Sequence, residues 1–66
     1  MELTQLEFAA IMTIHQEPDY CFVSNEKQLA QRMVRKRYLR EDTKRPGRYL
    51  VTATGERAYA SHSFHP

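Results

Sequence analysis

The sequence predicts one small α+β domain in the order helix, short strand, basic helix, β-hairpin and C-terminal helix. Three observations predict this order: a helix-capping signal near the N-terminus, an amphipathic segment after residue 24, and two alternating segments that flank Pro46-Gly47. The chain has 66 residues, which suffice for one domain with a small core. We assign residues 1–61 to this domain and residues 62–66 to a flexible tail.

The first helix begins with a capping box, Thr4-Gln5-Leu6-Glu7, in which the Thr4 and Glu7 side chains each accept the other residue's amide. We expect the helix to continue to about His15, since Pro18 ends any remaining turn. Apolar side chains occupy most of its circumference, so the helix is central in the domain, contacts a second chain, or does both. We expect a homodimer whose interface residues come from this helix: Leu6, Phe8, Ile11 and Met12.

The next two elements are a brief strand and a second helix. Residues 20–23 are aromatic and β-branched, which predicts the strand. The helix is expected to begin at Ser24 or Asn25 as its N-cap, with Gln28 completing a capping box from Asn25. One side of this helix is apolar and includes the stem of Arg37, whereas the other side is basic.

After the second helix the residue period changes to two, which predicts strands over residues 38–42 and 48–52. Pro46-Gly47 suits the centre of a type II turn between them, because proline presets φ and glycine supplies a positive φ. Thr52 is expected to cap a last helix over residues 53–60. This part of the chain therefore predicts a hairpin with a basic tip, followed by a short helix.

The formal net charge of +2 conceals a strong division along the chain. Residues 1–26 carry five acidic side chains and no Lys or Arg, for a net charge of −5. Residues 27–48 carry nine basic and two acidic side chains, for a net charge of +7. Arginine predominates among the basic residues, and its planar guanidinium suits phosphate or carboxylate groups. The basic segment predicts a polyanionic partner, and a solvated helix face is the alternative interpretation.

The order of elements and three short motifs resemble winged helix-turn-helix domains of the MarR- and PadR-like regulators. Residues 28–34, QLAQRMV, are similar to the "ELA..L" run of these bacterial regulators, and residues 38–42, YLRED, to their "GYL.R" entry into the wing. Residues 49–55, YLVTATG, are similar to their "Y.LT..G", the second wing strand with the helix that follows. The resemblance covers about residues 3–60. The chain is shorter than this pattern by about one helix, so the recognition helix is either fused or missing.

This resemblance implies a small DNA-binding transcriptional regulator or accessory factor that contacts duplex DNA through the basic helix and the wing. Gln and Arg side chains would pair with adenine and guanine in the major groove, and the wing would contact phosphates or the minor groove. The DNA-binding residues that we expect are Gln28, Gln31, Arg32, Arg35 and Lys36 on the helix, and Lys44, Arg45 and Arg48 on the wing.

The alternative function is a small phage- or plasmid-type protein-interaction module that binds and inhibits a host protein or a nucleoprotein complex. A winged helix that lacks a complete recognition element suits that role. Catalysis is not expected, because the sequence shows no nucleophile–base spacing, no paired carboxylates and no glycine-rich phosphate loop. No cofactor or metal is expected either. Cys21 is interpreted as a small hydrophobe, and His62 and His65 lack a third ligand.

Two features of the sequence predict a cytoplasmic protein with no membrane partner. The mean hydropathy is −0.71, and charged residues interrupt the longest apolar stretches. The N-terminal residues also lack the basic start and the apolar run of a signal peptide.

Overall fold

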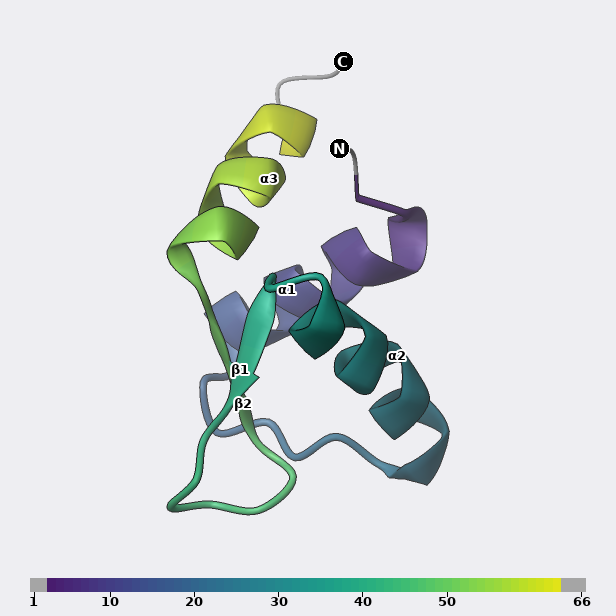
Figure 1. The fold of residues 1–66 in the computed structure, drawn as a ribbon, viewed down its shortest axis with the longest axis vertical. Helices are drawn as coiled ribbons and strands as arrows, with labels where there is room; N and C mark the ends of the chain where they lie inside the picture. The colour runs from purple at the N-terminus through teal and green to yellow at the C-terminus, as the bar shows by residue number, and fades with distance from the viewer. Residues whose placement is uncertain (1–2, 64–66) are drawn as a thin grey trace.

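The computed structural model describes residues 3–63, which form a small α+β fold (Figure 1). Helices α1 (Gln5–Gln16), α2 (Ser24–Arg35) and α3 (Ala53–Ser63) pack around a hairpin made of β1 (Leu39–Glu41) and β2 (Tyr49–Val51). The α+β class predicted from the sequence is confirmed. Within the described residues, a single helix of 12 residues lies between the loop after α1 and the hairpin.

Helix α1 begins where the sequence predicts, because both halves of the capping box are formed. The Thr4 hydroxyl accepts a hydrogen bond from the Glu7 amide at 3.1 Å, and the Glu7 carboxylate accepts one from the Thr4 amide at 2.9 Å. Ile11 and Ile14 follow on the same helix and are buried in the core. Burying a side chain of this size contributes about 1.5–3 kcal/mol, so α1 supplies a large part of the stability of the core.

The segment between α1 and α2 is not a strand, so the short strand predicted for residues 20–23 is wrong. The Phe22 amide donates a hydrogen bond to the Gly47 carbonyl at 2.9 Å, but no strand ladder is assigned to this segment. Phe22 is buried, and its ring meets Tyr49 edge to face with centroids 5.2 Å apart. The aromatic residues that predicted strand pairing are therefore used for side-chain packing against the hairpin.

Helix α2 begins at Ser24, and its N-cap is Val23, which has no side-chain acceptor. The predicted caps at Ser24 or Asn25 are wrong, since both residues lie inside the helix. The Glu26 carboxylate instead accepts the Val23 amide at 3.0 Å and the Tyr20 hydroxyl at 2.9 Å. One acidic side chain thereby holds both the start of α2 and the loop before it.

The end of α2 is closed by a Schellman motif with arginine at the position that glycine usually takes. Arg37 has φ +69°, in the left-handed region. The Tyr38 amide donates to the Met33 carbonyl at 2.9 Å, and the Arg37 amide donates to the Val34 carbonyl at 3.0 Å. Arg37 is exposed and lies outside the helix. This corrects the expectation that its stem belongs to the apolar side of α2.

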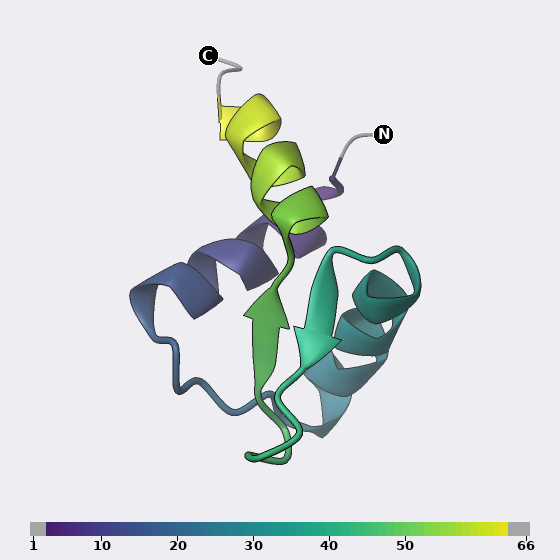
Figure 2. The same cartoon turned by 60° about the vertical axis from the view of Figure 1, so that its left-hand side comes forward.

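Strands β1 and β2 pair antiparallel with Leu39 opposite Val51, and both lie within the segments predicted to be strands. Leu39 is buried, whereas Arg40 and Glu41 are both exposed, so burial does not alternate along this three-residue strand. Figure 2 shows α2 beside β1 and α3 leading on from β2. The hairpin therefore connects the basic helix to the C-terminal helix.

The turn of the hairpin has the predicted chemistry. The Arg48 amide donates to the Arg45 carbonyl at 3.2 Å, and Gly47 has φ +82°. A Cβ atom on Gly47 would lie 2.9 Å from the Cys21 sulfur. Glycine at this position therefore satisfies both the backbone conformation and the close approach of the loop before α2.

Helix α3 is capped by Thr52 as predicted, because its hydroxyl accepts the Gly55 amide at 3.0 Å. The helix extends to Ser63, so residues 62 and 63 are helical and do not belong to the predicted tail. The rest of that tail, residues 64–66, lies outside the described residues. The longer helix adds a further turn to the side of the molecule that faces α1.

An aromatic cluster joins α3 to α1. The Phe8 ring stacks on Tyr59 with centroids 4.7 Å apart and lies 4.5 Å from the His62 ring. His15 meets Tyr59 edge to face, and its Nε2 atom lies 2.9 Å from the Glu56 carboxylate. These contacts cover a second side of α1, so most of its apolar circumference is used within the chain.

Candidate nucleic-acid interface

The surface of α2 that points away from the core carries polar and basic side chains. We call this surface the outer face of α2 and define it by Gln28, Gln31, Arg32 and Arg35, which are all exposed. Helical spacing places these four side chains on successive turns. They lie opposite Ala30 and Met33, which are fully buried.

The outer face carries positive charge without neutralisation by its own chain. Among residues 3–63, neither Arg32 nor Arg35 forms an ion pair. Glu26 is the acidic residue of α2, and it is turned toward Tyr20. Glu41 of the hairpin borders this face, because it lines a hollow of about 200 Å³ together with Gln31 and Arg35. The arrangement is that of a weakly screened basic surface with one carboxylate at its edge.

Lys36 is turned away from the outer face and toward α1. Its ammonium lies 2.8 Å from the Glu7 carboxylate, which is only 3% exposed. Burial acts to raise the pKa of Glu7, but the hydrogen bonds from Lys36 and from the Thr4 amide outweigh it and hold the pKa below the ordinary value. Lys36 is therefore committed to a contact within the chain, and it is a weaker candidate for DNA contact than Arg35.

The predicted wing residues also differ in whether contacts within the chain hold their side chains. The Arg45 guanidinium pairs with Asp19 of the loop before α2 and with Asp42, 3.1 Å away. Its hydrogen bond to Asp42 is the main cause that lowers the pKa of that carboxyl. The Arg48 guanidinium donates to the Asp19 carbonyl at 3.1 Å. The Lys44 side chain forms no hydrogen bond or ion pair among the described residues, and its charge acts on Asp42 only from a distance, as a minor cause of the lowered pKa of that carboxyl.

Two further exposed arginines lie close in sequence to the basic helix and were not among the predicted site residues. Arg40 is on β1, and Arg37 is in the turn between α2 and β1. Neither forms an ion pair within residues 3–63. The predicted strand over residues 38–42 could have identified Arg40, because an arginine without an acidic partner is rarely buried. Arg37 could not have been identified in this way, because its position depends on the left-handed turn.

The residues predicted for a dimer interface do not form one exposed surface. Ile11 is fully buried, and Phe8 is stacked on Tyr59. Met12 is half-buried, whereas Leu6 is 66% exposed. Of the four residues, Leu6 is the one that a second chain could reach over most of its surface.

The described part of the chain holds no group of three His, Cys, Asp or Glu side chains placed to bind a metal. His62 packs on Phe8, and His65 lies outside the described residues. Each helix within residues 3–63 is too short or too polar to cross a lipid bilayer.

Comparison with models of protein families, with curated proteins and with solved structures gives no match for this chain.

Proposed function

We propose that this protein binds duplex DNA through the outer face of α2, assisted by Arg40 and Lys44 of the hairpin, and acts as a small regulator or accessory factor. The observation that carries the proposal is the pair of exposed guanidinium groups of Arg32 and Arg35, which form no ion pair within residues 3–63 and lie beside Gln28 and Gln31. Bound phosphates would release counterions from the DNA, which supplies most of the affinity of small basic modules.

The dimensions and chemistry of α2 support this function. A helix of 12 residues is about 18 Å long, which is compatible with insertion into the major groove. Arginine pairs with two acceptors of guanine and glutamine with the edge of adenine, so that the outer face offers groups for either base. The regulatory role and the use of the hairpin as a wing rest on the resemblance to winged helix-turn-helix domains.

The ion pairs within the chain reduce the number of basic residues that are available to contact DNA. Lys36 and Arg45 are neutralised by Glu7, Asp19 and Asp42. Breaking these pairs to reach a phosphate would offset part of the gain from the new contact. We therefore assign the principal contacts to Gln28, Gln31, Arg32 and Arg35 of the outer face, with Arg40 and Lys44 of the hairpin in support.

The test is a titration of labelled nonspecific duplex DNA, followed by fluorescence anisotropy at 50 and 200 mM salt. With three phosphate contacts, the affinity should fall about 40-fold over this fourfold change in salt. Arg35→Glu should abolish most of the binding, whereas Arg57→Glu, the same charge reversal on α3, should have a much smaller effect.

Two outcomes would count against DNA binding. Absence of binding at 50 mM salt would overturn the proposal and favour the protein-interaction module as the function. Equal losses for Arg35→Glu and Arg57→Glu would show that general charge, and not the outer face of α2, determines the affinity. A second series with the salt held constant and the DNA sequence varied would then show whether base contacts contribute.

A further inference from the structure

Glu41 differs from most carboxylates of the fold, because no hydrogen bond or ion pair holds it. Within residues 3–63, the carboxylates that accept a hydrogen bond or form an ion pair are those of Glu7, Asp19, Glu26, Asp42 and Glu56. Glu17 and Glu41 do neither, and both are exposed. Glu17 lies at the end of α1, whereas Glu41 lies on β1 and borders the outer face of α2.

The hollow of about 200 Å³ at this border brings Glu41 together with Arg35 and Gln31 of α2. Its remaining lining residues are Val34 and Tyr49, which is opposite Glu41 in the strand register and is buried. Burial raises the pKa of Tyr49, and the negative charge of Glu41 adds to this effect. No ion pair joins Glu41 to Arg35, although both line the same hollow. The hollow therefore presents an acceptor and a donor of opposite charge close to each other.

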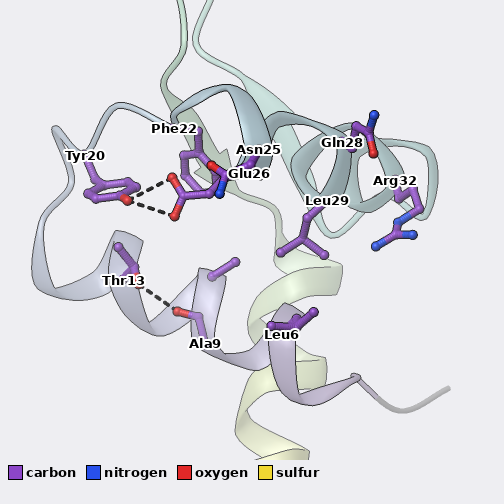
Figure 3. Close-up of a pocket in the computed structure, with 11 residues that line it drawn as sticks. Leu6, Ala9, Thr13, Tyr20, Phe22, Asn25, Glu26, Gln28, Leu29 and Arg32 are labelled. Atoms are coloured by element: carbon purple, nitrogen blue, oxygen red, sulfur yellow. Dashed lines mark hydrogen bonds between the residues drawn. The ribbon is translucent and has the colours of Figure 1, made fainter.

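The acidic residue of α2 itself is not available in this way. Figure 3 shows the Glu26 carboxylate turned toward Tyr20 and away from Gln28 and Arg32. The Tyr20 hydroxyl lies 2.9 Å from both oxygens of this carboxylate. Among the described residues, Glu41 is therefore the acidic side chain that DNA on the outer face would meet.

We propose that Glu41 determines base specificity by accepting a hydrogen bond from the N4 amino group of a cytosine, within one base pair of a guanine contacted by Arg35. This inference rests on the proposed function, because it requires DNA on the outer face of α2. In the major groove guanine offers two acceptors, which suit the guanidinium of Arg35, whereas cytosine offers a donor and no acceptor. An ionised carboxylate has acceptors only, so cytosine is the base that complements Glu41.

The other bases complement Glu41 less well. Adenine offers an amino group with the N7 acceptor beside it, and thymine offers an acceptor and a methyl group. Next to these groups and to the phosphates, the carboxylate loses water without gaining a complete set of donors. Glu41 therefore lowers the affinity for nonspecific DNA and favours a cytosine-containing site by about tenfold.

The experiment selects binding sites from duplex DNA with a randomised centre at 50 mM salt, using wild type and Glu41→Gln. Wild type should enrich sites in which a cytosine lies within one base pair of a guanine. Glutamine complements the edge of adenine, so Glu41→Gln should change the preferred base at that position from cytosine to adenine. Its affinity for nonspecific duplex DNA, measured by anisotropy, should rise about threefold, because a repulsive charge is removed.

Glu17→Gln is the matched control, since it also removes an exposed carboxylate that has no ion pair within residues 3–63. It should select the same sites as wild type. Because Glu41 is exposed, Glu41→Gln should keep the circular dichroism spectrum of wild type, which excludes a folding defect as the cause of any change.

The possible failures are distinguishable. If wild type binds DNA but Glu41→Gln selects the same sites, the role of Glu41 is overturned and the proposed function stands. Binding of wild type without any base preference has the same meaning. If wild type binds no DNA at 50 mM salt, both the proposed function and the role of Glu41 are overturned.

Discussion

The Lys36 ammonium lies 2.8 Å from the nearly buried Glu7 carboxylate, so the basic helix α2 is joined to the acidic N-terminal helix α1. A second pair, Arg45 with Asp19, joins the hairpin to the loop before α2 in the same way. In both pairs the acid comes from residues 1–26 and the base from residues 27–48. The acidic and basic segments therefore partly neutralise each other in the fold, whereas the outer face of α2 retains its positive charge.

Replacing Glu7 with Gln should lower the free energy of unfolding by about 1 kcal/mol at pH 7, because the Lys36 ammonium then donates to an uncharged amide oxygen in place of a carboxylate. The pKa of Glu7 is lowered in the folded protein, so its contribution is complete above the ordinary value of 4.5 and is lost as the pH falls through the lowered value. Urea unfolding of both proteins from pH 7 to pH 2 should show curves that converge in acid.

Glu17→Gln provides the matched control for this measurement. Glu17 is exposed and makes no side-chain ion pair within residues 3–63, so its replacement should change the unfolding free energy by less than about 0.5 kcal/mol. A constant difference between wild type and Glu7→Gln at every pH would contradict the assigned role of the Glu7 charge.

Replacing Arg37 with Gly should stabilise the protein by about 0.5–1 kcal/mol. Arg37 has φ +69°, where a Cβ atom is unfavourable and glycine is not. Thermal unfolding should show a midpoint about 4 °C higher for a domain of this size. Arg40→Gly, on an exposed strand position three residues later, should lower the midpoint. A lower midpoint for Arg37→Gly would show that the Schellman motif does not determine the end of α2.

Replacing Gly55 with Ala should destabilise the protein, although this exchange within a helix ordinarily contributes about 1 kcal/mol of stability. A Cβ atom at Gly55 would overlap the Tyr38 carbonyl oxygen and lie 2.9 Å from Cγ1 of Val51. We expect a loss of about 2 kcal/mol or more, since backbone must move to make room. Ser61→Ala, at an exposed site of the same helix, should be neutral. Chemical unfolding distinguishes the two, and a stabilised Gly55→Ala would contradict the close packing of α3 on the hairpin.

Replacing two arginines with alanine should distinguish a cation that is available to DNA from one that is held in ion pairs within the chain. Arg35→Ala should weaken binding roughly fivefold and reduce the salt slope by about 0.9, as expected for one lost phosphate contact. Arg45→Ala should change the affinity less than about twofold, because Arg45 is already held by Asp19 and Asp42. Anisotropy titrations at three salt concentrations measure both quantities. A larger effect at Arg45 would show that the hairpin releases its ion pairs on binding.

Much of the fold is predictable from local signals in the sequence. The Thr4–Glu7 box, the Pro46-Gly47 turn and the Thr52 cap each depend on residues within a few positions, and all three are formed as predicted. The predicted N-cap of α2 is wrong because the side chain that caps this helix is Glu26. Its carboxylate accepts the Val23 amide and also the hydroxyl of Tyr20 in the preceding loop. The strand predicted for residues 20–23 failed because its aromatic pattern also suits packing on a hairpin.

By itself, the sequence determined the α+β class, the number of helices, the hairpin and the concentration of basic residues after residue 26. Those features follow from periodicity, capping and composition, which are local properties of the chain. Only the tertiary structure decided which cations are free, because ion pairs such as Lys36 with Glu7 join residues 29 positions apart. It also decided which side of α1 is left uncovered, since that depends on where α2, α3 and the hairpin pack around this helix.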